Sequence, residues 1–307
     1  MAEPVLSLLT LEQHRLLGRW LGPWEVEEDM SWRIQGIHVL RLGTAGGPVV
    51  VKASATSHHI QRELRAHLQM TAPLGDRAPR LLHGDARAGL IVTSWLPGRL
   101  VEGGPHEFSP DIFRQAGELL ARFHQPRHET SSYDPAALNK LGDFADRAAG
   151  LVPAEQLRAV RLLAATHRPA PRMLFATHGD YQPRNWVEDG GMLGVIDFGR
   201  AGYRPWVTDL VRLEHRYFAA DATRAGSTHD GALQEGGMPT TPAHDGGALR
   251  AAFYAGYGRD PAEEPDSWRL DNLLQALGTV VWSHDVGDPA FEEEGRGMLT
   301  RVLTNLP

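Results

Sequence analysis

Residues near the middle of the chain have types and spacings that suit the transfer of a phosphoryl group. Asp180 follows His178 by two residues, Asn185 comes five residues later, and Asp197 begins an Asp-Phe-Gly sequence. Phosphoryl transfer needs positioning and charge neutralisation more than covalent help from the protein. A carboxylate can accept or orient the proton of an incoming hydroxyl, and Mg²⁺ binds carboxylate and amide oxygens beside phosphates. The pattern predicts Asp180 as the base or orienter, and Asn185 and Asp197 as Mg²⁺ ligands.

A short hairpin is needed to bring these residues together. Apolar runs at residues 186–187 and 193–196 flank a turn at residues 188–191, so two short strands can pair. Pairing would place Asn185 and Asp197 at the same end of the ribbon, with His178 in a structural role that braces the loop. Either motif alone is most often a plain loop or a strand followed by a turn. Both motifs in this order indicate a kinase-type site.

The sequence His-Gly-Asp-x-x-x-x-Asn followed by Asp-Phe-Gly resembles the aminoglycoside phosphotransferase family, which includes choline and homoserine kinases. The resemblance covers most of the chain and implies a two-lobed, protein-kinase-like α+β fold. It implies an N-terminal lobe with an antiparallel sheet and a helix (residues 1–97), a mainly helical C-terminal lobe (98–307), and the cofactors ATP and Mg²⁺. One departure is Gln182, where protein kinases usually have lysine and many antibiotic kinases histidine. A cation at the γ-phosphate would then come from elsewhere, such as Arg184.

The first hundred residues have the pattern of an N-terminal lobe. A capping box at Thr10 predicts a first helix that ends at Gly22. The apolar pattern then changes to short β-like runs at residues 24–28, 37–42, 49–53, 80–84 and 89–96. The first three runs predict an antiparallel meander.

Lys52 follows three valines near the end of the third run, where the resembling fold places its phosphate-binding lysine. Glu63 borders the apolar face of the following helix and is expected to pair with Lys52. The alternative for both is a solvated side chain at an edge. Ser31 lies in the first turn of the meander, which has one glycine, and is a weak candidate for binding phosphate; the alternative is a plain hairpin loop.

The resemblance also implies a hinge between the lobes at Pro97-Gly98. Backbone groups of Ser94, Trp95 and Leu96 would then bind the adenine, and the side chains of Val51 and Leu96 would lie on its two faces. Hinge contacts are made by the backbone, so the residue types specify them poorly.

Helical patterns dominate the rest of the chain, at residues 110–123, 154–166, 268–284 and 288–303. Pro126 separates His124 from His128, so both are interpreted as loop residues and not as a zinc pair. Asp209 matches the family's aspartate that braces the catalytic loop. The segment before it is too short for a protein-kinase activation segment, which favours a small-molecule acceptor. Residues 219–248 lack apolar periodicity and are interpreted as a loop insertion, with a lid as the alternative.

Acidic residues of the C-terminal lobe bind the amino groups of aminoglycosides in the resembling family. Asp285, with Trp282 beside it at a helix end, is the most site-like candidate here. Asp271 lies opposite the apolar stripe of its helix, so it either binds the acceptor or is solvated. The run Glu292-Glu293-Glu294 is interpreted as a solvated helix face.

Composition narrows the class of protein. The 307 residues are 42% hydrophobic and 22% charged, with no cysteine and no apolar run of membrane-spanning length. The start of the chain lacks a signal-peptide pattern, so a cytoplasmic location is expected. The chain is expected to be a monomer or a homodimer. The net charge of −7 argues against nucleic acid. It mildly favours a cationic acceptor, but solubility is the preferred explanation of the total charge. The leading prediction is an aminoglycoside-type antibiotic kinase. The alternatives are a metabolic kinase for a sugar, choline or another amino alcohol, or a homoserine-like acceptor, and a nucleotide-binding pseudokinase.

Overall fold

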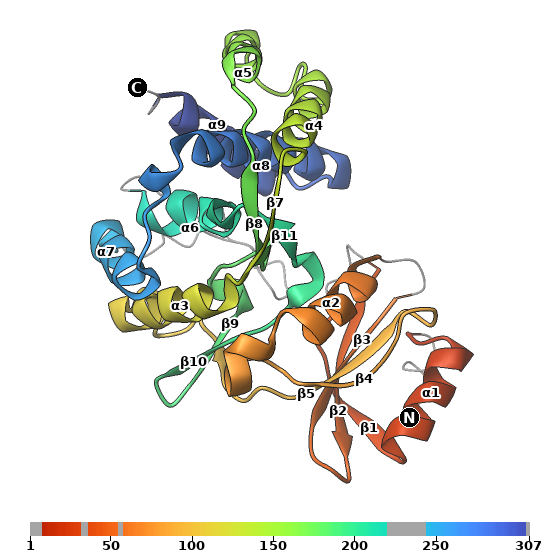
Figure 1. Ribbon diagram of the computed structural model, residues 1–307. Coiled ribbons are helices and arrows are strands. Elements are labelled where there is room, and N and C mark those ends of the chain that lie inside the picture. Colours follow the sequence, from red (N-terminus) through yellow and green to blue (C-terminus); the bar gives the residue numbers. More distant parts are fainter. Residues whose placement is uncertain (1–7, 32–35, 55–57, 220–243, 305–307) are drawn as a thin grey trace, which may run out of the picture. The chain divides into compact units, whose positions relative to one another are not determined.

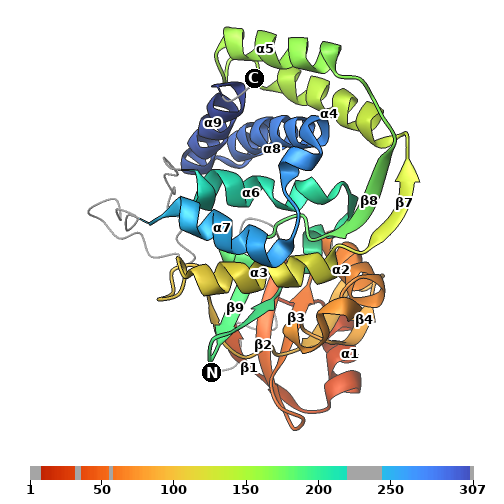
Figure 2. The same ribbon diagram turned by 60° about the vertical axis from the view of Figure 1, so that its left-hand side comes forward.

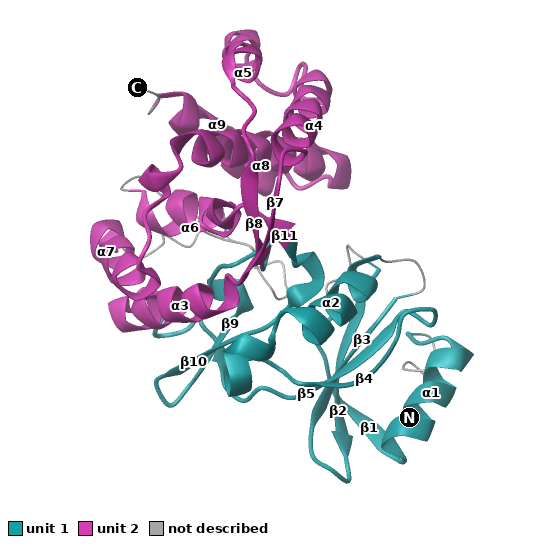
Figure 3. Ribbon diagram, in the orientation of Figure 1, with its two compact units in different colours: residues 1–107, 178–202 teal, residues 108–177, 203–307 magenta. Residues whose placement is uncertain are grey.

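The computed structural model describes residues 8–31, 36–54, 58–219 and 244–304 (Figure 1). The chain divides into two compact units (Figure 3). Unit 1 comprises residues 1–107 and 178–202, and unit 2 comprises residues 108–177 and 203–307. The hairpin that carries the two motifs therefore groups with the N-terminal sheet, while the functional lobes of residues 1–97 and 98–307 stay a prediction.

Unit 1 is built on an antiparallel sheet with the strand order β1-β2-β3-β5-β4. Its strands are β1 (Trp24–Asp29), β2 (His38–Thr44), β3 (Val49–Ala53), β4 (Leu81–Asp85) and β5 (Leu90–Ser94). Helix α1 (Leu11–Leu21) packs Leu16 and Leu17 into a core with alternate residues of β2, β3 and β5. Helix α2 (His58–Gln69) lies on the other side of the sheet (Figure 1). The short turn η2 (Ala72–Arg77) leads from α2 toward β4.

The start of α1 agrees with the sequence pattern. The hydroxyl of Thr10 accepts a hydrogen bond from the backbone of Gln13, and the side chain of Gln13 accepts one from the backbone of Thr10. Gly22 ends the helix with φ of 71°, a conformation that glycine adopts without strain.

A second, smaller sheet in unit 1 carries the candidate site. It has the order β10-β9-β6 and contains β6 (Arg99–Leu100), β9 (Trp186–Asp189) and β10 (Met192–Val195). Two short turns, η3 (Pro183–Asn185) and η4 (Phe198–Arg200), stand at the open end of the β9–β10 hairpin. Residue 186 pairs with residue 195, and the backbone N–H of Ile196 donates to the carbonyl of Asn185 at 3.0 Å. The hairpin therefore brings both motifs together, as its length predicts.

Unit 2 is mainly helical (Figure 2). Its longer helices are α3 (Pro110–Phe123), α4 (Tyr133–Arg147), α5 (Ala154–Thr166), α7 (Gly246–Tyr257), α8 (Pro265–Val286) and α9 (Pro289–Thr304). Its shorter ones are η5 (Trp206–Asp209), α6 (Val211–Leu213), η6 (Glu214–Phe218) and η7 (Pro261–Glu263). Helices α4, α5, α8 and α9 enclose one core of leucine, valine and alanine side chains. No helix in the described ranges is both long and apolar enough to span a membrane.

Two elements of this region differ from the sequence-based expectation. Helix α4 was not predicted, because its apolar spacing is interrupted by polar residues such as Asn139 and Lys140. Strands β7 (Pro126–Thr130), β8 (Arg172–Thr177) and β11 (Gly202–Arg204) form a third sheet, so His128 lies in a strand and not in a loop. The predicted insertion at residues 219–248 falls mostly on residues 220–243, which lie outside the described ranges.

Candidate active site

A chain of ion pairs joins Lys52 to two carboxylates of unit 1. Lys52 Nζ lies 2.9 Å from each carboxylate oxygen of Glu63 and 2.7 Å from Oδ1 of Asp197. The side chains of Lys52 and Glu63 are 16% and 5% exposed, whereas that of Asp197 is 49% exposed. Strand β3, helix α2 and the hairpin end thus meet at one lysine, and the expected pair of Lys52 with Glu63 is present.

The protonation states of Lys52, Glu63 and Asp197 depend on one another. Burial alone would lower the pKa of Lys52, but Asp197 and Glu63 outweigh it and hold that pKa above its usual value. Desolvation would raise the pKa of Asp197, yet the Lys52 ammonium outweighs it and lowers this pKa to about 2. Burial raises the pKa of Glu63 in spite of Lys52. Lys52 is therefore charged and Asp197 ionised at neutral pH.

Three side chains of the same loop hold the carboxylate of Asp180. Gln182 Nε2 donates to Oδ1 at 2.5 Å, and Arg184 Nη2 donates to Oδ2 at 2.5 Å. Asn185 Nδ2 donates to Oδ2 at 3.2 Å and to the carbonyl of Asp180 at 2.8 Å. Asp180 is 5% exposed. The tight turn η3 makes these bonds possible, because residues two to five positions apart then lie around one carboxylate.

The donor set at the hairpin end fits Mg²⁺. Because the amide nitrogen of Asn185 donates to Asp180, its amide oxygen is the side-chain atom left to bind a cation. Asp197 supplies a half-exposed carboxylate. Hard oxygen ligands of this kind, completed by phosphates, are what Mg²⁺ requires. No group of three or more histidines, acids or cysteines that could hold a metal occurs among the described residues, so the phosphates would have to complete the coordination.

Asp197 has an unusual backbone. Its φ is 64°, and it is the single residue other than glycine with positive φ in the described ranges. Such a conformation costs about 1 to 3 kcal/mol and persists where the surrounding structure enforces it. Here His178 Nε2 donates to the carbonyl of Ile196, and His59 Nδ1 donates to that of Gly199. These bonds on both sides of Asp197 hold its carboxylate toward Lys52, which supports the structural role predicted for His178.

A column of rings lies behind the ion pairs. The ring centroid of Phe198 is 5.0 Å from that of His178 and 5.4 Å from that of His67. Burial first, and then the charge of Lys52, lower the pKa of His67 to about 4, so its ring is neutral. His67 was not among the residues predicted from the sequence, although it lies four residues after Glu63 and therefore on the same face of α2.

The residues expected around the nucleotide have clear local partners. Ser31 Oγ accepts from the backbone N–H of Val39 at 3.0 Å, and Ser94 Oγ accepts from that of Arg80. The guanidinium of Arg41 lies over the ring of Trp95, with Cζ of Arg41 5.1 Å from the ring centroid. Leu96 packs on Gly194, where a Cβ would lie 2.6 Å from its side chain.

Val51 lies on the face of β3 opposite to the one that its expected contact with adenine requires. Its side chain is fully buried in the core that β3 shares with α1. Successive side chains of a strand point to opposite faces, so the face that carries Lys52 carries Val50. The proposed adenine contact by Val51 is therefore wrong, and the two-residue period of β3 already contained this information.

Asp209 binds a histidine of unit 2. His124 Nε2 donates to Asp209 Oδ2 at 3.0 Å, and the hydroxyl of Tyr257 lies 2.7 Å from His124 Nδ1. His124 and Asp209 are 7% and 2% exposed. His124 is therefore a buried residue of the short connection between α3 and β7, where it caps the end of α3, and the bracing role of Asp209 stays a prediction.

The acceptor candidates of unit 2 lie in different environments. Asp271 is 2% exposed and not solvated; the hydroxyls of Tyr133 and Thr208 both donate to its Oδ1 at 3.0 Å. Burial raises its pKa to about 7. Asp285 is half-exposed, and its carboxylate accepts from Arg147 at 2.5 Å. Trp282 packs edge-on against Phe291.

The acidic run at the start of α9 is also not a solvated face. Glu292 and Glu294 are each 9% exposed, and only Glu293 faces solvent. Glu292 accepts from Arg296, and Glu294 lies 3.3 Å from Nε of Arg216. The interpretation as a solvated run was wrong because α9 turns this part of its surface toward α8 and η6. These two acids are neutralised inside unit 2.

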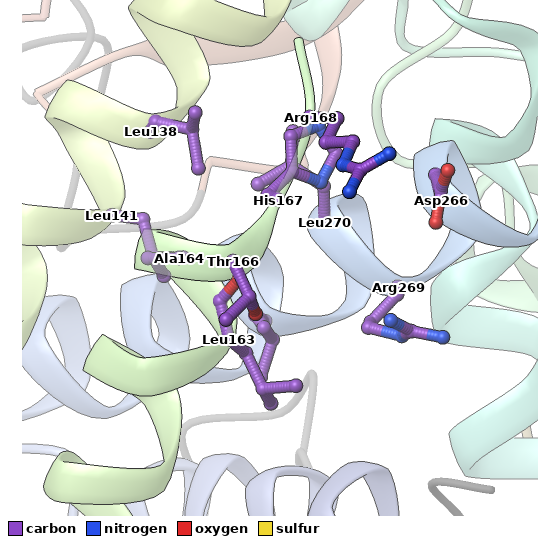
Figure 4. A pocket seen from close by; sticks show the side chains of 11 residues that line it. Leu138, Leu141, Leu163, Ala164, Thr166, His167, Arg168, Asp266, Arg269 and Leu270 are labelled. Atoms are coloured by element: carbon purple, nitrogen blue, oxygen red, sulfur yellow. The ribbon is translucent and has the colours of Figure 1, made fainter.

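Unit 2 also contains a small cavity of about 140 Å³ between α4, α5 and α8. Leu138, Leu141 and Ala164 line one side, and Asp266 and Arg269 lie on the opposite side (Figure 4). None of the predicted catalytic, nucleotide or acceptor residues lines this cavity, so it is separate from the candidate site.

A model of the phosphotransferase enzyme family, APH, matches residues 38–270. The chain belongs to this family. The match includes Lys52, Glu63, Asp180, Asn185 and Asp197, the residues that the geometry gathers in unit 1. As a member of the family, the protein is a phosphotransferase. No curated protein matches the sequence.

Solved structures confirm the protein-kinase-like α+β fold. The gentamicin-APH(2")-IIa complex is 11% identical, with a TM-score of 0.60 over 97% of both chains. Aminoglycoside phosphotransferase APH(4)-Ia, in a ternary complex with AMP-PNP and hygromycin B, is 13% identical, with a TM-score of 0.63 over 96% of this chain and 98% of that one. A choline/ethanolamine kinase family protein from Mesorhizobium loti is 18% identical, with a TM-score of 0.56 over 95% and 91%. Identities this low show the fold alone.

Proposed function

We propose that this family member transfers the γ-phosphate of ATP, with Mg²⁺, to a hydroxyl group of a small molecule. The observation that carries the proposal is the meeting of Lys52, Glu63 and Asp197 in one chain of ion pairs within unit 1. Asp180 and Asn185 bond to one another, and Asn185 is joined to the Asp-Phe-Gly strand through Ile196. A pseudokinase would be expected to lack one of these groups, so the complete set favours an enzyme.

Each residue of the proposed site has a task. Lys52, held by Glu63, binds the α- and β-phosphates, and backbone groups of residues 94–96 bind the adenine. Asn185 and Asp197 hold Mg²⁺, which when bound neutralises the charge of the phosphates. Asp180 orients the acceptor hydroxyl and accepts its proton. The site would lie between lobes of residues 1–97 and 98–307, braced by His178 and Asp209, with Ser31 near the phosphates.

The leading acceptor class is an aminoglycoside-type antibiotic, supported by structural neighbours whose names include gentamicin and hygromycin B. Asp285 and Trp282 are the candidate acceptor residues, whereas Asp271, predicted with them, is 2% exposed and already bound by Tyr133 and Thr208. A metabolic acceptor such as a sugar, an amino alcohol or a homoserine-like molecule is the second candidate. The ion pairs of unit 2 favour this second candidate. Asp285, Glu292 and Glu294 are already paired with arginines, so their charges are less available to bind the amino groups of an antibiotic.

The test is acceptor-dependent ADP release from Mg²⁺-ATP over a panel of aminoglycosides, macrolides, choline, homoserine and sugars. The Asp180→Ala variant serves as the blank, and binding of Mg²⁺-ATP is measured in parallel by calorimetry. We expect one acceptor class to stimulate ADP release by the wild type and not by the Asp180→Ala variant. Full turnover by Asp180→Ala or Asp197→Ala, or a wild type that binds no Mg²⁺-ATP, would refute the proposal.

A further inference from the structure

Arg184 is the one arginine or lysine in the loop of residues 178–185. Its guanidinium lies beside the candidate catalytic carboxylate, with Nη2 donating to Asp180 Oδ2 at 2.5 Å. The side chain is 19% exposed, and an arginine guanidinium stays protonated in proteins. A second fixed cation, besides Lys52, therefore lies at the reaction end of unit 1.

The guanidinium has binding capacity to spare. Arginine carries five N–H donors in a planar fork that suits phosphate oxygens. One nitrogen binds Asp180, and Arg184 makes no other hydrogen bond to the part of the chain that the structure describes. The carboxylate of Asp180 does not depend on Arg184 alone for hydrogen bonds, because Gln182 donates to its Oδ1 and Asn185 also donates to its Oδ2.

We propose that Arg184 binds the phosphoryl group during its transfer while its Nη2 holds Asp180. This inference rests on the function proposed above and assigns the second cation of that site. An acceptor oxygen bonded to Asp180 would share that carboxylate with the guanidinium, so the transferred phosphorus would lie no more than about 8 Å from Nη2 of Arg184. The acceptor oxygen forms the new O–P bond, the bond to the β,γ-bridging oxygen breaks with its electrons on ADP, and the hydroxyl proton passes to Asp180. The free N–H groups of Arg184 then meet the charge on the phosphoryl oxygens.

The test needs no acceptor. ADP with Mg²⁺ and aluminium fluoride mimics the phosphoryl group in transfer, and calorimetry gives its dissociation constant and that of ADP with Mg²⁺ alone. We expect aluminium fluoride to tighten binding to the wild type and the Arg184→Ala variant to lose about tenfold or more of that gain, with ADP alone bound within about twofold of the wild type. Arg184→Lys keeps the charge without the fork and should retain part of the gain.

The matched control is Arg65→Ala, which removes an exposed arginine of α2 and should keep the full gain. Circular dichroism and melting curves identify any variant that fails to fold, and Arg184→Lys then serves in place of Arg184→Ala. If Arg184→Ala kept the gain, or if the wild type bound ADP and gained nothing from aluminium fluoride, the inference would be wrong. A wild type that bound neither ADP nor Mg²⁺-ATP would instead refute the proposed function itself.

Discussion

The ammonium nitrogen of Lys52 lies at the same distance, 2.9 Å, from both carboxylate oxygens of Glu63. This symmetric contact fixes a flexible lysine stem, and Asp197 binds the same nitrogen from the hairpin side at 2.7 Å. Helix α2 therefore controls where the lysine charge lies relative to the candidate Mg²⁺ ligand.

Lys52→Met should lower kcat/KM for ATP by about 10² to 10³, because it removes a fixed positive charge from the phosphates. It should also destabilise the protein by about 3 kcal/mol, because it leaves Glu63 buried without its partner. The double variant Lys52→Met with Glu63→Gln should regain stability and remain inactive. Steady-state kinetics and urea unfolding measure the two effects separately. Wild-type kcat/KM in Lys52→Met would contradict the assignment.

Asp271 should make stability depend on pH. Its pKa in the folded protein is about 7, above the ordinary value of 3.8, so the folded state holds the proton more strongly than the unfolded state. The associated stability is present below about pH 4 and is lost as the pH rises to about 7, at up to about 1.4 kcal/mol per pH unit. Asp271→Asn should remove this part of the slope. Urea unfolding at pH 5, 6, 7 and 8 tests it, with the exposed Asp266→Asn on the same helix as the control; equal slopes in all three proteins would refute it.

The buried set of His124, Asp209 and Tyr257 should contribute strongly to the stability of unit 2. Tyr257→Phe removes the hydroxyl next to His124 Nδ1 and should cost about 1 to 3 kcal/mol, the range for a buried polar atom that loses a partner. His124→Leu withdraws a donor from the buried carboxylate of Asp209 and should cost more, about 3 kcal/mol. Chemical unfolding gives both values, and a loss below about 0.5 kcal/mol in His124→Leu would contradict this interpretation.

Helices α3 and α7 cross so closely that glycine is required at two positions. A Cβ at Gly117 would lie 2.1 Å from the carbonyl oxygen of Phe253, and one at Gly256 would lie 2.1 Å from that of Arg114. Gly117→Ala and Gly256→Ala should each destabilise the protein by about 2 kcal/mol or more, since backbone must move. Gly142→Ala in α4 meets no atom within 4 Å and should stabilise it by up to about 1 kcal/mol. Thermal melts of the three variants measure the effects. If all three substitutions shifted the melting temperature in the same direction, this interpretation would be wrong.

The sequence by itself determined the elements whose cause is local. The number of residues between Asn185 and Asp197 matches one tight hairpin, so the sequence predicted that both residues lie at the open end of that hairpin. The apolar period and a capping box predicted α1, and the apolar period with Pro110 at its first turn predicted α3. Alternation predicted the meander, and the apolar face of α2 predicted that Glu63 could reach Lys52. Alternation of side chains along β3 would have predicted Val50, and not Val51, as the residue on the same face as Lys52.

Tertiary structure alone decided which polar groups are buried and what they bind. Asp271 lies on the polar side of α8 in the sequence pattern, yet Tyr133 and Thr208, which are distant along the chain, cover it. The partners of His124 and of Glu294 likewise come from elements far along the chain. Arg184 lies only four residues from Asp180, but whether its side chain turned to that carboxylate or away from it depended on the geometry of η3. The physical reason is that local periodicity states which face of an element is apolar, whereas the free energy of a buried charge depends on neighbours that only the folded chain supplies.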